Sequence, residues 1–98
     1  MIVLKTEENG KQTLLIKSSN LLVTEYDQST RELLVTFNNG GQYKYKDVAA
    51  NDFMRLQLEE SQGKAFRTYI EKKYKFDKLP TVNVEPIKEE INKLLNGK

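Results

Sequence analysis

Alternating apolar and polar positions in the first half of the chain predict strands. Residues 2–6 and 13–17 are rich in β-forming residues and flank Asn9-Gly10. An Asn-Gly pair favours a type I′ turn, because both of its central residues take positive φ. The pattern therefore predicts an N-terminal hairpin, with these pairs facing each other: Glu8 and Lys11, Thr6 and Thr13, Leu4 and Leu15.

Three more strands are predicted over residues 21–26, 31–37 and 42–46. The loop between the last two decides which side chains share a face. A two-residue loop would place apolar side chains opposite lysines. A three-residue loop ending at Gly40 places four apolar or aromatic residues on one face: Leu33, Val35, Tyr43 and Tyr45. Because sheet register follows the burial of one apolar face, we expect the longer loop, with Gly40 left-handed in a bulge.

The second half of the chain has helical periodicity. Asn51 or Asp52 is the expected cap of a first helix, and Ser61 is the expected cap of a longer one. The second helix has apolar residues at offsets of three, four and eight: Phe66, Tyr69, Ile70 and Tyr74. Residues 76–85 are expected to be a connecting segment. A last helix should start near Pro86, carry the stripe Ile87, Ile91, Leu94 and Leu95, and end at Gly97.

The order of these elements predicts an α+β fold. We expect an antiparallel sheet of about five strands, made of two hairpins and one further strand, followed by two helices packed on one face and a C-terminal helix. The chain divides into an N-terminal hairpin extension (1–17), a central domain (18–78), and a linker with an amphipathic helix (79–98). That helix is too short to be stable alone, so it should dock on its own domain in preference to another subunit.

Composition narrows the possible chemistry. The 98 residues include no Cys and no His, which excludes disulfides, thiolate zinc sites and His-based triads. We recognise no catalytic constellation, and we expect a binding protein that is not an enzyme and has neither cofactor nor metal. The N-terminal apolar run is too short for a signal peptide, and no stretch approaches the roughly 18 apolar residues of a membrane helix. These features predict a cytoplasmic protein.

Positive charge gathers in one part of the chain. The net charge is +2 overall, but residues 61–78 hold six basic and two acidic residues, a net charge of +4. Any anionic partner should meet the protein there. A solvated helix face is the alternative interpretation.

The start of the second helix is the candidate binding site. Gly63 lies in the first turn after Ser61, and glycine costs a helix about 1 kcal/mol relative to alanine. Either another backbone packs closely against Gly63, which is the more economical interpretation, or an anion approaches the uncovered N–H groups. Lys64 and Arg67 are three residues apart, so both side chains can reach the same ligand.

Tyr43 and Tyr45 lie two apart on a strand and share a face. If exposed, the two rings would form a platform on which bases stack. If buried, they would be core residues beneath the helices, with their hydroxyls bonded at the rim. The register argument favours burial.

Residues 18–74 resemble the KTSC domain, a short module named for the C-terminal end of some lysyl-tRNA synthetases that also occurs as small bacterial and phage proteins. The matching features, in order, are Ser19, Tyr26-Asp27, Leu33-x-Val35-x-Phe37, Gly40, Tyr43-Lys44-Tyr45, Val48, Phe53, Leu56, Ser61-x-Gly63, Phe66, Ile70 and Tyr74. The chain departs from the family pattern at Ala49, Glu59 and Arg67. The resemblance implies the fold, and RNA binding has been suggested for the family.

These observations predict a small binding module for a phosphate-bearing ligand, either an RNA segment or a nucleotide. Ser61 and Gly63 would bind it through backbone N–H groups, Lys64 and Arg67 through charge, and Tyr43 or Tyr45 by stacking. A phage anti-defence protein that sequesters a nucleotide messenger is one version. The alternative is a phage-type interaction or inhibitor protein that docks on a host protein. Sheet edges or the C-terminal helix could also build a homo-oligomer.

Overall fold

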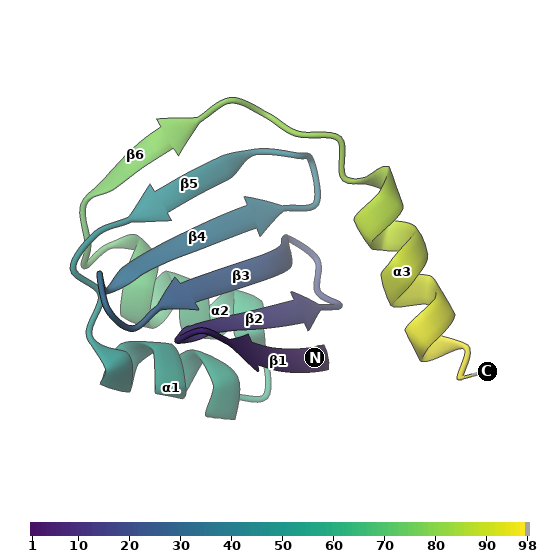
Figure 1. The fold of residues 1–98 in the computed structure, drawn as a ribbon, viewed down its shortest axis with the longest axis horizontal. Helices are drawn as coiled ribbons and strands as arrows, with labels where there is room; N and C mark the ends of the chain where they lie inside the picture. Colours follow the sequence, from purple (N-terminus) through teal and green to yellow (C-terminus); the bar gives the residue numbers. More distant parts are fainter. Residues whose placement is uncertain (98) are drawn as a thin grey trace.

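The computed structural model describes residues 1–97 as one antiparallel sheet with helices (Figure 1). The sheet has six strands, which lie side by side in chain order. They are β1 (Ile2–Glu8), β2 (Lys11–Ile16), β3 (Leu21–Asp27), β4 (Glu32–Phe37), β5 (Gln42–Tyr45) and β6 (Phe76–Leu79). The helices are α1 (Ala50–Leu58), α2 (Gln62–Phe66), the π-helix η1 (Arg67–Glu71) and α3 (Glu85–Leu95). The α+β prediction is confirmed.

Both hairpin predictions are confirmed. In the first hairpin Glu8 pairs with Lys11, and Asn9 and Gly10 have φ of 54° and 80°. In the second, β4 and β5 are joined by a three-residue loop, because Phe37 N–H bonds to Gly41 O at 2.9 Å. The register of β4 and β5 pairs the four residues that were expected on one face: Leu33 with Tyr45, and Val35 with Tyr43.

Gly40 is required on two counts. Its φ is +91°, a conformation that other residues rarely adopt, and a Cβ there would lie 2.5 Å from Val82 O. Val82 N–H also bonds to Gly40 O at 2.9 Å. The segment after β6 is therefore held against the β4–β5 loop on its way to α3.

The expectation that residues 76–85 only connect two helices was wrong for the first four of them. Phe76–Leu79 form β6 and extend the sheet beyond β5, with Phe76 opposite Tyr45 and Lys78 opposite Tyr43. The strand is short and Pro80 follows it, so the sequence offers little periodicity to detect. Its ladder is supported by the ion pair between Lys46 and Asp77 at 2.8 Å.

Two helix predictions need correction. The first helix begins at Ala50 after Ala49, and neither Asn51 nor Asp52 caps it. The second begins after Ser61 as expected, but α2 has only five residues and η1 continues it to Glu71, so that Tyr74 lies beyond it. Thr68 Oγ1 donates a hydrogen bond to Lys64 O at 2.9 Å. Hydroxyl bonds to the preceding turn loosen the helical ladder, which accounts for the wider turn.

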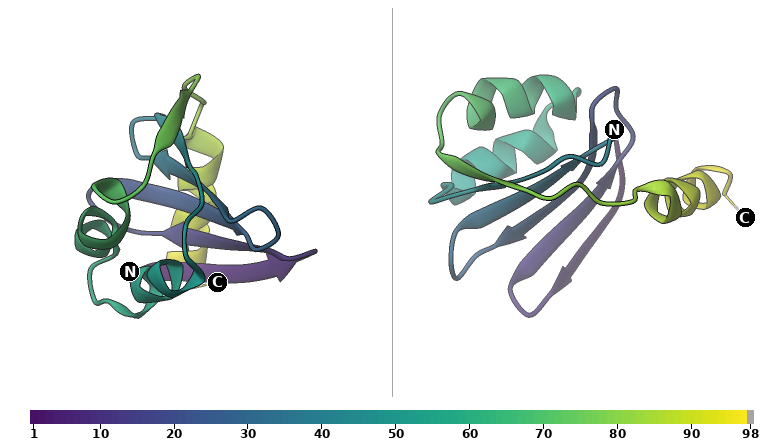
Figure 2. Two further views of the ribbon diagram at one scale, coloured as in Figure 1. Left: turned by 90° about the vertical axis from the view of Figure 1, so that its left-hand side faces the viewer. Right: turned by 90° about the horizontal axis from the view of Figure 1, so that it is seen from above.

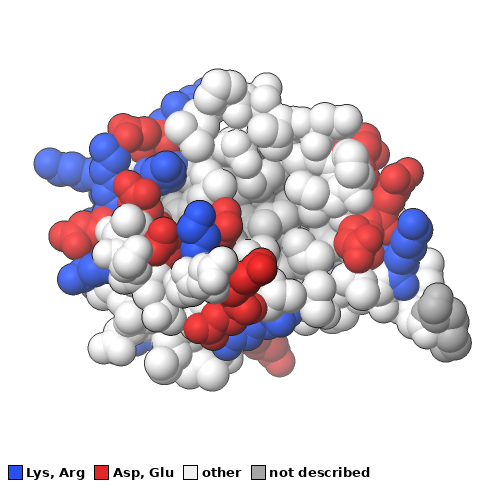
Figure 3. Space-filling model, viewed as in Figure 1, with Lys and Arg blue, Asp and Glu red and all other residues white. Residues whose placement is uncertain are grey.

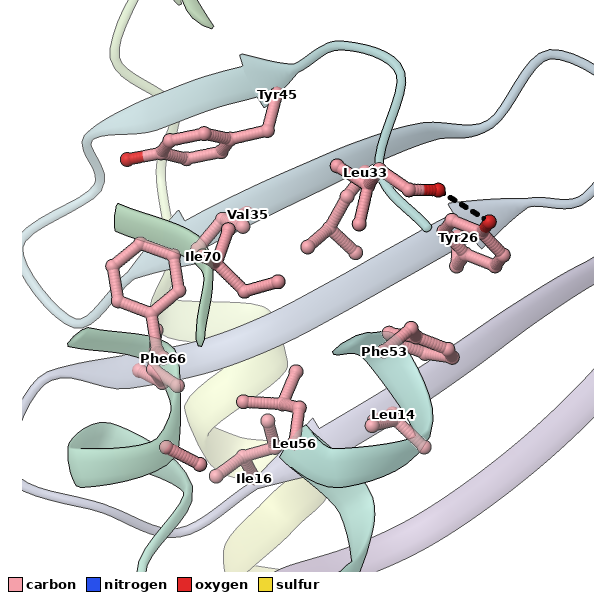
Figure 4. Close-up of a cluster of buried hydrophobic side chains, with 13 residues drawn as sticks. Leu14, Ile16, Tyr26, Leu33, Val35, Tyr45, Phe53, Leu56, Phe66 and Ile70 are labelled. Atoms are coloured by element: carbon pink, nitrogen blue, oxygen red, sulfur yellow. Dashed lines mark hydrogen bonds between the residues drawn. The ribbon is translucent and has the colours of Figure 1, made fainter. Parts of the chain in front are cut away.

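α1, α2 and η1 cover the inner face of the sheet and bury the main core (Figure 4). The core includes Leu14 and Ile16 of β2, so the N-terminal hairpin belongs to the same packed unit as the rest of the sheet. Tyr26 is fully buried, and its hydroxyl donates a hydrogen bond to Val48 O at 2.7 Å, drawn as the dashed line in Figure 4. The buried polar tip of this tyrosine is thereby satisfied.

α3 docks on its own chain, away from the other helices (Figure 2). Ile91 is 3% exposed and packs in a small second cluster with Leu22 and Val84, next to Leu15 and Val23 on the outer face of the sheet. Intramolecular docking, expected from the apolar stripe, is confirmed. Leu94 and Leu95, also placed in that stripe, are more than a third exposed. No helix within residues 1–97 is long and apolar enough to cross a membrane.

Candidate functional site

A cavity of about 590 Å³ opens where the β2–β3 and β4–β5 loops meet β5, β6 and the end of η1. Its size lies within the usual range of small-molecule sites, about 300–1,000 Å³. Aromatic side chains form one part of its wall and amide side chains form another. The cavity therefore combines flat apolar surfaces with a few hydrogen-bonding groups, as ligand sites do.

Three asparagines belong to the wall, and hydrogen bonds hold them in place. Asn38 Nδ2 donates to Ser18 O at 2.9 Å, which ties the two loops together. Asn39 Oδ1 accepts from Gly41 N–H at 2.9 Å, and Asn20 Oδ1 accepts from Ser18 Oγ at 3.1 Å. With their oxygens engaged, Asn20 and Asn39 keep their amide nitrogens as donors for a ligand.

The aromatic wall is built from three strands. Tyr43 is half-buried and meets Phe37 and Phe76 edge to face, with ring centroids 5.6 and 5.2 Å apart. Phe76 is 48% exposed, an unusual exposure for a large apolar ring in a strand. Edge-to-face packing fixes the ring planes, so a flat ligand would meet a prearranged surface.

Tyr45 contributes a polar tip to the same cavity. The residue is 3% exposed, and its ring packs edge to face on Phe66 with centroids 5.5 Å apart. Tyr45 lines the cavity, and among residues 1–97 the tyrosine hydroxyls that form hydrogen bonds are those of Tyr26, Tyr69 and Tyr74, so the Tyr45 hydroxyl has no partner there. Burial, together with the nearby Glu71 carboxylate, raises the pKa of Tyr45 to about 12. The hydroxyl therefore stays protonated and can donate a hydrogen bond.

The helical segment made of α2 and η1 reaches the cavity at its last residue, Glu71. Near the start of this segment, Gly63 lies against Asn20, which is part of the cavity wall. At the end of the segment, Glu71 lines the cavity directly. Arg67 lies four residues from both Gly63 and Glu71, so it falls on the same side of the helix between them. Its side chain is exposed, and Arg67 is not among the residues that line the cavity. Lys64 is exposed one turn before Arg67, whereas Lys78 of β6 lines the cavity itself.

The other ionic cluster ties helices together. Asp52 is 3% exposed and accepts hydrogen bonds from Lys73 Nζ, at 2.8 Å, and from the Tyr74 hydroxyl. The Tyr74 hydroxyl also accepts from Ala49 N–H at 3.1 Å. Burial would raise the pKa of Asp52, but the bonds from Lys73 and Tyr74 outweigh it and hold that pKa below its ordinary value. The cluster fastens the end of η1 to the start of α1.

A comparison with protein families identifies the fold. The family model described as the KTSC domain matches residues 17–74. The chain belongs to the KTSC domain family. The crystal structure of the KTSC domain protein YPO2434 from Yersinia pestis has a similar fold, with a TM-score of 0.66 and 27% sequence identity over 71% of this chain and 99% of that one. No curated protein matches the chain.

The KTSC domain contributes most of the cavity, and the segment after it completes the wall. Tyr43, Tyr45 and Glu71 lie within the matched residues, whereas Phe76 and Lys78 follow them. Sequence reasoning selected the two tyrosines but missed both strand β6 and the asparagines. The Asn38-Asn39 pair was assigned to a turn, and nothing in its spacing indicated that the β2–β3 loop would reach it.

The start of α2 is only partly as expected. Ser61 caps it, with Oγ accepting from Lys64 N–H at 3.3 Å. Gly63 is buried, and a Cβ there would lie 2.5 Å from Asn20 Oδ1. A close neighbour thus accounts for the glycine, although the neighbour is a side chain and the expected one was a backbone. Anion binding at the Ser61 and Gly63 amides stays a prediction.

The tyrosine pair divides between the two expected roles. Tyr45 is core, as the register argument favoured, while Tyr43 is half-buried and faces the cavity. A base could therefore contact the Tyr43 ring but only the hydroxyl of Tyr45. The candidate site is best described as the cavity with Lys78 in its wall, while Arg67 and Lys64 are exposed on the helical segment that ends at Glu71.

Proposed function

We propose that this KTSC protein is a non-enzymatic binding module for a nucleotide or a short single-stranded RNA segment. The base would enter the cavity and the phosphate would lie at its rim. The observation that supports the proposal is the combination of an aromatic wall, amide donors and Lys78 in one 590 Å³ cavity, with the exposed Arg67 and Lys64 on the helical segment that ends at Glu71. Nucleobases are flat and carry polar edges, and phosphates are anionic, so each part of the ligand meets a matching surface.

The aromatic wall would hold the base. Tyr43 and Phe76 lie edge to face, so a base can stack on one ring while its edge contacts the other. Stacking on an aromatic side chain stabilises a bound base by about 1–3 kcal/mol. Phe76→Ala tests this contribution with little effect on folding, because the side chain is half exposed. We expect it to weaken binding at least fivefold.

The phosphate would be held by side-chain charge. Arg67 presents a planar guanidinium that can bind a phosphate with two parallel N–H donors, and Lys64 adds a second charge one turn away. The backbone amides near Ser61 and Gly63 would assist from the same turn. Binding without turnover is all that sequestration of a nucleotide messenger requires, so a cytoplasmic anti-defence protein of a phage is one biological setting for this function.

Isothermal titration calorimetry with 5′-mononucleotides and 5′-phosphorylated trinucleotides tests the proposal. Arg67→Gln should weaken binding of all of them about tenfold, because a phosphate contact carries no base preference. Lys93→Gln on α3 is the matched control, since Lys93 is exposed and does not line the cavity. Absence of binding at millimolar ligand, or equal affinity of wild type and Arg67→Gln, would contradict the proposal.

One observation favours docking on a host protein as a second candidate function. The outer face of the sheet is uncharged over its part next to α3, whereas charged side chains cover the rest of it (Figure 3). Such surfaces often bind other proteins. A nuclease-resistant, stoichiometric partner recovered from host cells, and lost on Val23→Glu in the uncharged part of this face, would support that role. Nucleotide binding with no such partner would contradict it.

A further inference from the structure

The cavity pairs a hydrogen-bond donor with a carboxylate. Tyr45 is buried but lines the cavity, and its hydroxyl is not among the tyrosine hydroxyls that form hydrogen bonds within residues 1–97. Glu71 lines the cavity close enough for its charge to affect the Tyr45 hydroxyl. Glu71 has no ion-pair partner among the described residues, although Lys78 lines the same cavity. The carboxylate is therefore free to accept hydrogen bonds from a ligand.

We infer that Glu71 and Tyr45 make this cavity selective for guanine, an inference that rests on the nucleotide-binding function proposed above. A carboxylate accepts two parallel N–H bonds, one on each oxygen. Guanine presents two adjacent donors on its Watson–Crick edge, N1–H and the 2-amino group, with the acceptor O6 next to them. Glu71 accepts from the two donors, and Tyr45 donates to O6.

The other bases fit this pair less well. Adenine and cytosine each place a ring nitrogen lone pair beside their amino group, and that lone pair would face a Glu71 oxygen. Uracil offers a single N–H between two carbonyl oxygens, which repel the carboxylate. The free amide nitrogens of Asn20 and Asn39 are further donors, and guanine offers them the acceptors O6 and N7. Selectivity follows because a wrong base leaves the cavity's polar groups unpaired.

The location of Glu71 explains how the fold presents it. The π-helix η1 ends at Glu71, and the chain then turns into β6, which supplies Phe76 to the same wall. π-helical turns are rare and occur often at functional sites. In this chain the π-helical segment begins at Arg67 and ends at Glu71, the carboxylate of the cavity wall.

Calorimetry with four 5′-mononucleotides, GMP, IMP, AMP and UMP, and with the trinucleotides UGU and UAU, tests the inference. Wild type should bind GMP about ten- to a hundredfold more tightly than AMP or UMP, the discrimination of a good bidentate pair. IMP lacks the 2-amino group, so its affinity should lie between that of GMP and those of AMP and UMP. The trinucleotide UGU should likewise bind more tightly than UAU.

Single substitutions test whether Glu71 and Tyr45 cause the preference for GMP. Glu71→Gln should remove most of the GMP preference and leave AMP affinity unchanged or raised, because a Gln amide pairs with adenine. Glu60→Gln, an exposed change between α1 and α2, is the control and should keep the preference. Tyr45→Phe should lower the affinity for GMP more than the affinity for AMP.

The possible outcomes distinguish failure of guanine selectivity from failure of nucleotide binding. Equal GMP and AMP affinities that both fall in Arg67→Gln would overturn guanine selectivity and leave nucleotide binding standing. A GMP preference that survives Glu71→Gln would also overturn it. Lack of binding by all six ligands would remove the proposed function itself, together with the inference built on it.

Discussion

Gly63→Ala tests why a glycine occupies the first turn of α2. The added Cβ would lie 2.5 Å from Asn20 Oδ1, closer than real Cβ atoms come to any neighbour. A rotation of the Asn20 side chain away from the new Cβ would break the hydrogen bond that its Oδ1 accepts from Ser18 Oγ at 3.1 Å. Asn20 also lines the cavity, so the substitution would disturb the wall of the site.

The expected size of the effect follows from three contributions. Alanine gains about 1 kcal/mol over glycine in a helix. Against this, the Ser18–Asn20 hydrogen bond contributes about 1 kcal/mol, and overpacking a tight contact costs about 1–3 kcal/mol. Gly63→Ala should therefore lower the free energy of unfolding by about 1–3 kcal/mol. In an Asn20→Ala background the obstructing oxygen is gone, and Gly63→Ala should be neutral or stabilising by about 1 kcal/mol.

Chemical denaturation followed by far-UV circular dichroism measures all four proteins of this double-mutant cycle. A coupling free energy of at least about 1 kcal/mol between positions 20 and 63 is expected, since contacting residues rarely add independently. If Gly63→Ala costs the same in both backgrounds, then Asn20 is not the reason for the glycine. The helix start would then need the glycine for another purpose, such as an anion at its amides.

Three further predictions concern the ionic tie, the last helix and the phosphate contacts. Asp52→Asn should destabilise the protein by about 1–3 kcal/mol at neutral pH, because the bonds to a buried charge are lost. Since the folded pKa of Asp52 is lowered, its contribution is present above the unfolded value and lost as the pH falls through the folded pKa. Ile91→Ala should abolish hydrogen-exchange protection of α3 amides while β3 stays protected. Arg67→Gln should reduce the salt dependence of nucleotide affinity by a slope of about one.

Each of these has an outcome that would contradict it. The stability difference between wild type and Asp52→Asn should shrink in acid, and a constant difference from neutral pH down to pH 2 would show that the charge plays no part. Leu95→Ala, at a site 37% exposed, is the control for Ile91 and should leave α3 protected. An unchanged salt slope in Arg67→Gln would place the phosphate elsewhere.

The fold could be predicted where local signals and burial agree. Asn9-Gly10 and the three-residue loop ending at Gly40 fixed two registers, because turn geometry and the apolar face pointed to the same pairing. β6 was not predicted from the sequence, because a four-residue edge strand is stabilised by its hydrogen-bond ladder with β5 and has little pattern of its own. The π-turn also escaped, since the Thr68 bond that loosens the helix competes with an apolar spacing typical of an ordinary one.

The candidate site could be predicted only in its parts. Arg67, Lys64 and Tyr43 were identified from charge and from strand alternation. The asparagines and Glu71 join Tyr43 in the cavity wall only through tertiary structure, because the β2–β3 loop, the β4–β5 loop and the end of η1 converge from distant parts of the chain. Gly63 was correctly identified as unusual, and its close neighbour proved to be the side chain of Asn20.

Nuclear magnetic resonance with ¹⁵N-labelled full-length protein tests the central claim most directly. Titration with GMP should shift the side-chain amide signals of Asn20, Asn38 and Asn39, which lie in the cavity wall. The backbone signal of Gly41 should move with them, and signals of Asn92 on α3 should stay in place. Shifts confined to α3 or to the N-terminal hairpin, or the absence of any shift at millimolar GMP, would contradict a nucleotide site in this cavity.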